Sequence, residues 1–504
     1  MVASKYDKCE PMESEFIQRA KALSALGAGL SVDVYSPDLL QLVDALDEAE
    51  LHPGYLEVFK ATTSAMHWVR RRLPDMPLTY HGEGLWTTQP DFPQSNSGRQ
   101  GVAEACAQLA ALRSAWLNHE CATKQMVGYA FGTYLPPLYT EWSATMTAEN
   151  VTFLQAQVDT QAQQDGIDPA LVLLEMPPLT YFGCGSLAIP RFFRQVTELS
   201  ACGLVLDIGH LWTVYRYTGA WRRQTVESFV AEFLDEFPME RVIEIHVAGL
   251  AEFQTSVNRV TAADARDRPY WIDAHGASIP ALLFDLLAQV LAHPRLRSLK
   301  GVALEVDTKP IATIVEEYGR FVTRFERSIT EVQRIGHAGS LPSRRAETGY
   351  GLDVRKTLTA DERSALHHQY QWYVHRVTAC DPQSIEGELS LLGGSPEDLS
   401  RYRDCYLPHE LLHWGGELQD MFPKTCGLLA EAGVPLEQFV SAWFSRPRPE
   451  QDDYDFFLLK IDRFVEFVEQ WCPKAAQRVG DEARELRDAY RAANEPIGSV
   501  GERV

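Results

Sequence analysis

Short hydrophobic runs alternate with longer segments of helical period between about residues 25 and 330. Eight of these runs have the length and composition of buried strands, and six of the intervening segments have the pattern of amphipathic helices. The strand-like runs span residues 26–32, 54–59, 77–81, 114–119, 171–175, 203–207, 241–246 and 301–305. The helix-like segments span residues 36–49, 101–113, 149–164, 188–201, 225–237 and 280–292. This order predicts an α/β fold, a TIM-like (β/α)8 barrel, although an open doubly wound sheet would give a similar pattern.

The pattern changes after about residue 335. Residues 336–351 are rich in Gly, Ser and charge, which is typical of a linker. Thr359 and Glu362 then form a capping-box pattern, and long stretches of helical period follow. We therefore predict four parts, namely an N-terminal extension (1–24), a TIM-like metal-binding barrel (25–334), a linker (335–358) and a mainly α-helical C-terminal domain (359–504).

Composition and charge narrow the class of protein. The chain has no uninterrupted apolar run of about 18 residues, so no membrane span is predicted, and no apolar segment follows a basic one at its start, as a signal or transit peptide would require. The formal net charge of −22 disfavours binding to nucleic-acid phosphates. Nine cysteines are scattered without CxxC spacing, which is typical of a reducing cytoplasm. We therefore expect a cytoplasmic protein that binds neither membrane nor nucleic acid.

The last residues of six predicted strands are all of metal-ligand type. They are His81, His119, Glu175, Asp207, His246 and Glu305. In a (β/α)8 barrel the carboxyl ends of all strands open onto one face, so these side chains should converge. His210 follows Asp207 by three residues, and Asp273 and His275 flank one small residue in the segment WIDAHG. If that segment is a strand entering a loop, both side chains project to the same side.

Nine convergent side chains are too many for one cation, because a mononuclear site usually takes three or four protein ligands. The count fits a cluster of two or three metals with a carboxylate such as Glu175 as the bridge. Nitrogen and oxygen ligands without thiolate permit zinc, iron or manganese. A single polar residue at a strand end is more often solvated than a ligand, but six in register point to a metal cluster. We leave Glu57 outside this set, because it could equally face the core.

The segment HELLH, His409–His413, matches the HExxH pattern, which on a helix places two imidazoles on one face. Gln419 stands where the longer metalloprotease motif needs a third histidine, and Pro408 favours the first turn of a helix. We interpret the segment as a capped helix start with a histidine packed near Trp414 rather than as a protease site.

The order of the nine residues resembles the metal-binding constellation of the xylose-isomerase-like barrels, which include endonuclease IV. Local segments narrow the resemblance, namely LTYHGEGL, LPPLYTEW, GLVLDIGH, EIHVAGL, IDAHGASIP and ALEVDTKP. They are similar to the multinuclear non-haem iron-dependent oxidative enzymes, whose members include the iron enzyme of methanobactin biosynthesis and the enzyme that excises a cysteine carbon in thiaglutamate biosynthesis. The resemblance covers about residues 25–330.

This resemblance implies a barrel that holds two or three iron ions (Fe2+/Fe3+) and uses O2 as co-substrate. It implies oxidation of a Cys, Asp or Asn residue in a ribosomally synthesised precursor peptide, or of a related small molecule, in natural-product biosynthesis. A small partner protein often presents the peptide, a role that the C-terminal domain could take here. Carried over, the ligands are His81, His119 and Glu175 for one ion, Glu175, Asp207, His246 and Glu305 for the central ion, and His210, Asp273 and His275 for the third.

The sequence departs from the family pattern at three places, and these departures affect the expected identity of the substrate more than the expected metal ligands. Met176 follows Glu175 where the family commonly has Asn, Leu250 replaces a frequent second histidine, and 26 residues separate His246 from Asp273. Two alternatives use similar ligands. A zinc phosphodiesterase of the endonuclease IV type is disfavoured by the negative charge, and a sugar isomerase or epimerase would use a two-metal subset without oxygen.

Overall fold

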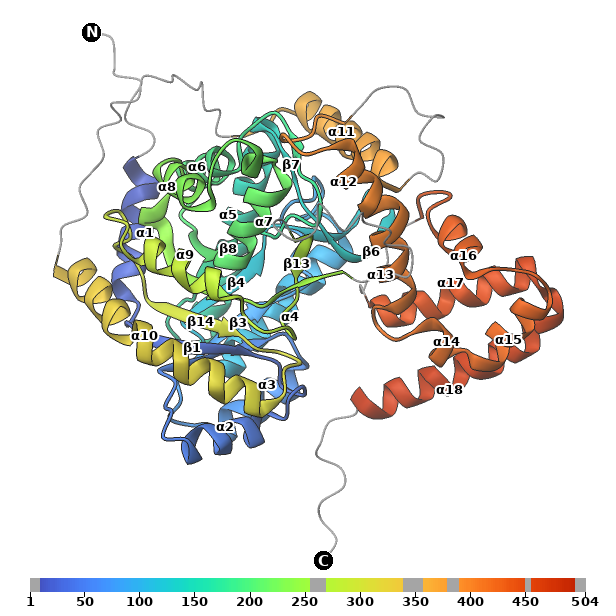
Figure 1. Cartoon of the computed structure of the whole chain (residues 1–504), viewed down its shortest axis with the longest axis horizontal. Coiled ribbons are helices and arrows are strands. Elements are labelled where there is room, and N and C mark those ends of the chain that lie inside the picture. Colours follow the sequence, from blue (N-terminus) through green and yellow to red (C-terminus); the bar gives the residue numbers. More distant parts are fainter. Residues whose placement is uncertain (1–9, 254–268, 339–356, 379–388, 449–454, 495–504) are drawn as a thin grey trace, which may run out of the picture.

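The computed structural model describes residues 10–253, 269–338, 357–378, 389–448 and 455–494 (Figure 1). Eight parallel strands close into a barrel in the order β1-β14-β11-β10-β8-β4-β3-β2. They are β1 (Gly27–Val32), β2 (Tyr55–Phe59), β3 (Leu78–Gly82), β4 (Trp116–Glu120), β8 (Leu171–Glu175), β10 (Gly203–Asp207), β11 (Val242–Val247) and β14 (Gly301–Glu305). The pairing of the first and last strands, Gly27 with Gly301, distinguishes the barrel from an open sheet. All eight predicted strands and the predicted fold class are confirmed.

Helices surround the barrel (Figure 1). They are α2 (Leu39–Glu48), α3 (Thr63–Arg72), α4 (Asn96–Leu112), α5 (Glu141–Asp165), α6 (Ile189–Leu199), α7 (Ile208–Tyr217), α8 (Val226–Glu236), α9 (Ala281–Leu291) and α10 (Ile311–Ala338), with short 3-10 turns at Ala220–Arg222 and Met239–Arg241. Several begin at a side-chain cap, as at Asp38, Thr62 and Ser95, which satisfies a free backbone N–H of the first turn. The sequence pattern predicted six of these helices and missed α3, α7 and α10.

The N-terminal extension includes a helix, α1 (Glu10–Ala22), that covers the amino end of the barrel. Its Phe16 and Ala20 are buried with Tyr55 and Trp116, which stand at the starts of β2 and β4. This second hydrophobic cluster closes the end of the barrel opposite to the predicted ligands.

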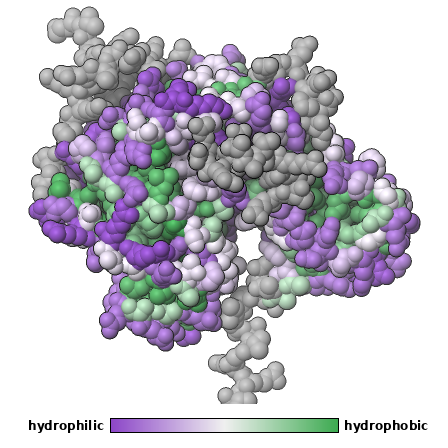
Figure 2. All heavy atoms as spheres, viewed as in Figure 1, coloured by the Kyte–Doolittle hydropathy of each residue, from purple (hydrophilic) through white to green (hydrophobic). Residues whose placement is uncertain are grey.

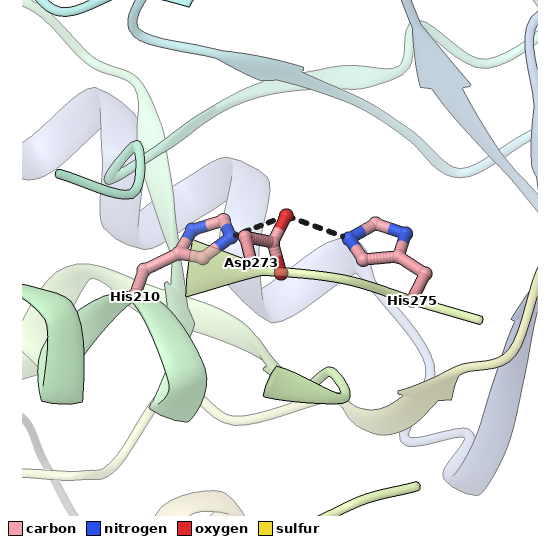
Figure 3. Close-up of side chains that lie close together, drawn as sticks. All are labelled: His210, Asp273 and His275. Carbon is pink, nitrogen blue, oxygen red and sulfur yellow. Dashed lines mark hydrogen bonds and ion pairs between the residues drawn. The ribbon is translucent and has the colours of Figure 1, made fainter. Parts of the chain in front are cut away.

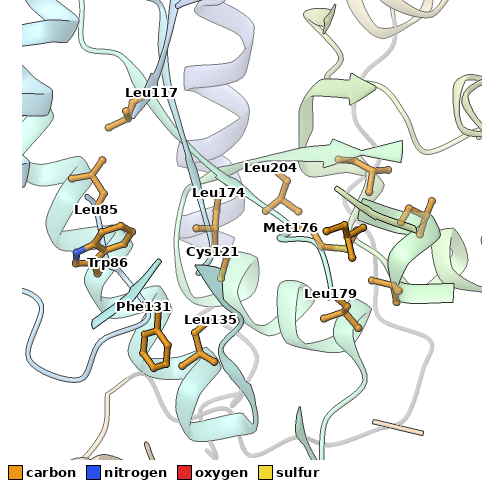
Figure 4. Close-up of a cluster of buried hydrophobic side chains, with 14 of the residues drawn as sticks. Leu85, Trp86, Leu117, Cys121, Phe131, Leu135, Leu174, Met176, Leu179 and Leu204 are labelled. Carbon is orange, nitrogen blue, oxygen red and sulfur yellow. The ribbon is translucent and has the colours of Figure 1, made fainter. Parts of the chain in front are cut away.

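Short strands extend the opposite, carboxyl end of the barrel. They are the hairpin β5 (Thr123–Met126) and β6 (Tyr129–Leu135), the pair β7 (Leu138–Tyr139) and β9 (Cys184–Gly185), and the pair β12 (Leu250–Glu252) and β13 (Trp271–Asp273). Figure 4 shows hydrophobic side chains of this region, among them Phe131 and Leu135 of β6 with Cys121 and Met176. The predicted strand in WIDAHG is therefore present as β13. Most of the long segment that precedes it, residues 254–268, lies outside the described residues.

The C-terminal region is helical, as predicted. It holds α11 (Ala360–Thr378), α12 (Pro396–Arg401), a π turn (Tyr402–Tyr406), α13 (Leu407–His413), α14 (Leu418–Met421), α15 (Pro423–Glu431), α16 (Leu436–Trp443), α17 (Phe456–Trp471), a 3-10 turn (Pro473–Ala475) and α18 (Ala476–Asn494). The predicted capping box is formed, because Glu362 N–H donates to Thr359 Oγ1 and Thr359 N–H donates to Glu362. Most of the predicted linker, residues 339–356, lies outside the described residues.

Helices α11, α12 and α13 lie beside β6 and β7 of the barrel, whereas α14 to α18 form a group farther out (Figure 1). Tyr373 Oη donates to the Pro136 carbonyl at 3.1 Å, and Trp443 Nε1 donates to the Ala130 carbonyl at 2.8 Å. The barrel and the C-terminal helices share one continuous hydrophobic core. The C-terminal region is thus joined to the barrel through buried contacts.

The face of the molecule in Figure 2 is mainly hydrophilic, with hydrophobic patches over the barrel helices and over the C-terminal helices. Among the described residues, no helix combines the length and the hydrophobicity that crossing a bilayer requires.

Candidate metal centre

All nine predicted ligand residues lie at the carboxyl end of the barrel. His81, His119, Glu175, Asp207, His246 and Glu305 stand at or next to the ends of β3, β4, β8, β10, β11 and β14, while His210 lies in the first turn of α7, Asp273 ends β13 and His275 stands in the turn that follows β13. Seven of them are buried, and the side chains of Asp273 and His275 are only 22% and 27% exposed. Asp207 is also the N-cap of α7, where it accepts the His210 N–H at 2.6 Å. The strand-to-helix turn therefore keeps these two candidate ligands together.

His210, Asp273 and His275 form one compact group (Figure 3). The Asp273 carboxylate lies between two imidazoles, with its Oδ2 3.6 Å from His210 Nε2 and 3.0 Å from His275 Nε2. Their potential ligand atoms all lie within 4.8 Å of one another. The three residues expected at the third ion are thus brought together.

A second group lies deeper and consists of Glu175, Asp207, His210 and Glu305, with ligand atoms again within 4.8 Å of one another. Three of these residues were expected at the central ion. The fourth expected residue, His246, lies next to them, because its Nδ1 is 3.4 Å from Glu175 Oε1 and 3.2 Å from Glu305 Oε1. His210 stands between the second and third groups.

The residues expected at the first ion are less closely grouped. His81 Nε2 lies 3.3 Å from Glu175 Oε2, and His81 also forms a group with Glu57 and Glu305. His119 is in none of the ligand groups that the described residues form. Its Nδ1 lies 3.2 Å from the Glu120 carbonyl, and its buried Nε2 has no hydrogen-bond partner. The structure therefore joins His81 to Glu175 and leaves His119 beside them.

Several residues of this centre lie outside the predicted set, namely Glu57, which was left out of it, and Asn118 and Asp307, which no sequence pattern indicated. Glu57 is fully buried, accepts a hydrogen bond from Ser31 Oγ at 3.1 Å and lies 3.2 Å from His246 Nε2. Asn118 Nδ2 donates to Glu175 Oε2 at 2.7 Å. Asp307 Oδ1 lies 2.7 Å from His275 Nδ1. Closure of the barrel turns Glu57 inward, whereas the alternation of a five-residue strand does not reveal which face is inside.

The protonation of the centre reflects its burial and its mixture of acids and imidazoles. Burial raises the pKa of Asp207 to about 6 and that of Glu57 to about 7. Burial alone would also raise the pKa of Glu175, but His246 and His81 hold that pKa well below its usual value. Burial would lower the pKa of His81, yet Glu175 and Glu57 raise it to about 9. Neighbouring opposite charges thus decide the protonation of Glu175 and His81.

Buried polar atoms without hydrogen-bond partners indicate whether metal ions could bind in this centre. Buried atoms without a hydrogen-bond partner include Glu175 Oε1, Asp207 Oδ2, Asp273 Oδ1, Glu305 Oε2, His119 Nε2 and His210 Nε2. Buried polar atoms normally find partners, so an unpaired set in one place needs an explanation. Cations bound among these atoms would satisfy them and would offset the clustered negative charge. The donor set therefore fits bound metal ions.

The HELLH segment has a different environment from the one expected. The helical backbone runs without interruption from Pro396 through the π turn to His413, so Pro408 lies inside a helical run and does not start one. A π turn supplies hydrogen bonds of different spacing, which accommodates a residue without an N–H. The rings of His409 and His413 stack with centroids 3.7 Å apart. No ligand group among the described residues includes either histidine.

Glu410 of this segment should affect stability through its pKa, which burial raises to about 7 against the opposing effect of Lys124 and Lys460. When folding raises the pKa of a carboxyl group, the free energy of unfolding of the protein falls as the pH rises from the unfolded-state pKa to the folded-state pKa. The substitution Glu410→Gln should therefore stabilise the protein at pH 8, by on the order of 2 kcal/mol, and change little at pH 4. Urea unfolding at both pH values measures this, and an equal effect at both would contradict it.

Comparison with known proteins places residues 25–323 within a family. This segment matches the sequence model described as “RiPP precursor modification enzyme MbnB/TglH/ChrH”. A UPF0276 protein of Paraburkholderia phytofirmans is 25% identical over 275 residues, which cover 52% of this chain and 76% of that protein. A UPF0276 protein of Bordetella parapertussis is 25% identical over 311 residues, which cover 60% of this chain and 93% of that protein.

Among solved structures, endonuclease IV from Thermus thermophilus aligns with a TM-score of 0.36 and 13% identity, over 60% of this chain and 99% of that chain. A D-psicose 3-epimerase from Clostridium cellulolyticum aligns with a TM-score of 0.32 and 10% identity, over 62% of this chain and 98% of that chain.

Proposed function

The chain belongs to the MbnB/TglH/ChrH family of RiPP precursor modification enzymes, and on that premise we propose that it is a multinuclear iron- and O2-dependent oxidative enzyme. Its substrate is a Cys, Asp or Asn residue of a ribosomally synthesised precursor peptide, or a related small molecule. The observation that carries this proposal is the convergence of His, Asp and Glu side chains at the carboxyl end of the barrel, eight of the nine predicted residues among them, with buried ligand atoms that lack partners.

The ligand types admit iron, zinc and manganese, and the family resemblance favours iron. Bound iron would supply the electrons that reduction of O2 requires, which a zinc site could not supply. The chain itself would contribute a rigid set of side chains, most of them at strand ends, which limits how far the ligands can move. Glu175 and Asp207 are fully buried, so bulk water has little access to the inner part of the centre.

Glu175 is the proposed bridge between two ions because its two oxygens face different partners. Its Oε2 lies 3.3 Å from His81 Nε2 and is held by Asn118 Nδ2. Its Oε1 lies 3.4 Å from His246 Nδ1 and has no hydrogen-bond partner. The Glu175 carboxylate would then help to hold a cation beside His81 and another beside His246, and Asn118 would orient it.

We assign to the C-terminal helices the presentation of the peptide, in place of a small partner protein. Two observations support this role. The family match ends at residue 323, so the C-terminal helices are additional to it. Helix α13 and β6 lie in close contact, as the Glu410 carbonyl next to Gly132 shows, and β6 belongs to the carboxyl end of the barrel. A peptide bound along these helices would therefore lie close to the metal centre.

Metal analysis joined to an oxygen assay tests the proposed function. The chain is purified anaerobically, loaded with iron or with zinc, and mixed with synthetic peptides from short Cys- or Asp-rich reading frames beside its gene. Iron-loaded protein should consume O2 and change the peptide mass, and zinc-loaded protein should do neither. Zinc as the metal that co-purifies, together with no O2 uptake by the iron form, would contradict the proposal and favour the phosphodiesterase or isomerase alternatives.

A further inference from the structure

Asp307 is a carboxylate outside the predicted ligand set that binds one of its histidines. It lies two residues after Glu305, in the loop that joins β14 to α10. Its Oδ1 is 2.7 Å from Nδ1 of His275, and the geometry is that of a hydrogen bond. The other ring nitrogen, His275 Nε2, lies 3.0 Å from Asp273 Oδ2 and 3.2 Å from Glu305 Oε2. The imidazole therefore has Asp307 on one side and the metal-ligand carboxylates on the other.

The two loops that carry this pair are fixed against each other. Gly276 follows His275, and a Cβ atom at this position would lie 2.6 Å from Thr308 Oγ1, so the two loops pack closely at this point. Below them Lys309 Nζ donates to Glu317 Oε2 at 2.7 Å, and the other oxygen of Glu317 accepts the Ile279 N–H at 2.9 Å. Lys309 and Glu317 are both buried. This clamp ties the Asp307 loop to the end of the His275 loop.

Other histidines of the centre show the same arrangement with backbone partners. His210 Nδ1 lies 2.8 Å from the Met176 carbonyl, and its buried Nε2 has no hydrogen bond. His119 Nδ1 lies 3.2 Å from the Glu120 carbonyl, and its Nε2 is likewise unpaired. Metal-binding imidazoles usually donate their second N–H to such an acceptor, which fixes the tautomer and the ring orientation. At His275 the acceptor is a carboxylate.

We propose that Asp307 is the positioning residue of the third metal site. It holds the Nδ1–H tautomer of His275, so that Nε2 binds a divalent cation together with His210 and Asp273. The charge of Asp307 also makes the imidazole a stronger donor toward the cation. This inference rests on the proposed metal centre, but it does not depend on iron, O2 or a peptide.

The tautomer of His275 tests the proposed role of Asp307 directly. In zinc-loaded protein labelled with 15N-histidine, the imidazole 15N resonances distinguish a metal-bound nitrogen from a protonated one. We expect His275, assigned by its loss in His275→Ala, to show a zinc-bound Nε2 and a protonated Nδ1. Zinc bound through Nδ1 would overturn the role of Asp307 alone. A His275 that binds no zinc would overturn both the role of Asp307 and the third site of the proposed centre.

Variants measure the strength of the effect through zinc affinity, with no need for enzyme activity. Asp307→Ala should lower the affinity for the most weakly bound zinc ion about 10–100-fold. Asp307→Asn should restore most of that affinity, because its amide oxygen can still accept the Nδ1–H. Asp285→Ala removes an exposed aspartate that pairs with Arg324 and serves as the control, with no expected change.

The double variant shows whether Asp307 acts through His275. When His275 is already alanine, adding Asp307→Ala should change the zinc affinity less than about twofold, because the two residues form one unit. Equal zinc affinities of wild type and Asp307→Ala, or an additive loss in the double variant, would overturn the proposal.

Discussion

Replacing Glu175 with glutamine is expected to remove more bound metal than any other single isosteric substitution in the barrel. Glu175 is fully buried, and its carboxylate faces His81 through one oxygen and His246 through the other. A neutral amide of the same size keeps the packing but cannot bridge two cations as a carboxylate does. We expect the metal content to fall by at least half, and O2 uptake by the iron-loaded form to fall by about 100-fold or more. Elemental analysis and an oxygen electrode measure the two effects.

A matched control separates this effect from general damage. Glu482 of α18 is also buried, and its carboxylate accepts hydrogen bonds from the backbone and hydroxyl of Thr425. Glu482→Gln should lower the free energy of unfolding by about 1–3 kcal/mol and leave the metal content unchanged. Full metal occupancy in Glu175→Gln would contradict the bridging role, and equal metal loss in both variants would indicate that unfolding causes it.

The barrel could be predicted from sequence because its signals are local. Each buried strand is a short hydrophobic run that ends in a polar residue, and a parallel barrel places all of those ends on one face. The pair Asp273 and His275 was predicted from the rule that residues two apart on a strand project to the same side. The strand is present as β13 but ends at Asp273, so the turn that holds His275 brings the His275 Nε2 and Asp273 Oδ2 atoms to 3.0 Å.

Which of the candidate ligands lie next to one another could not be predicted from the sequence. Which imidazole faces which carboxylate depends on the stagger of neighbouring strands, and sequence does not specify it. His246 thus lies between Glu305 and Glu57, although Glu57 was left outside the predicted set. Gly276 is a similar case. The sequence does not reveal that a Cβ atom at this position would lie 2.6 Å from Thr308 Oγ1.

For the C-terminal helices, too, the sequence predicted the local structure but not the long-range contacts. Their helical period was readable, and so was the capping box at Thr359. Their attachment to the barrel depends on long-range contacts, such as Tyr370 Oη with Ser143 Oγ at 2.7 Å and the bridge between Cys184 and Leu391. The domain boundary at residue 359 stays a prediction, and its independence can be tested directly.

A chain that ends at residue 338 is expected to lose most of its soluble yield, and any soluble fraction should melt at least about 10 °C lower than the full chain. The truncation would expose aromatic side chains of the barrel that now pack on the C-terminal helices. Phe182 contacts Tyr402 with ring centroids 4.9 Å apart, and Phe131 contacts Phe444 at 5.9 Å. Exposed apolar patches of this kind favour aggregation.

Co-expression of residues 357–504 as a separate chain should restore solubility, because the aromatic cluster of Phe422, Phe439 and Phe464 gives α14 to α18 a core of their own. Tyr373→Phe provides a graded control. It removes only the hydrogen bond to the Pro136 carbonyl and should cost about 1 kcal/mol in the full chain. A soluble truncated barrel with an unchanged melting temperature would instead establish two independent domains. In that case the contacts at β6 would serve to place the C-terminal helices beside the metal centre, without stabilising the barrel.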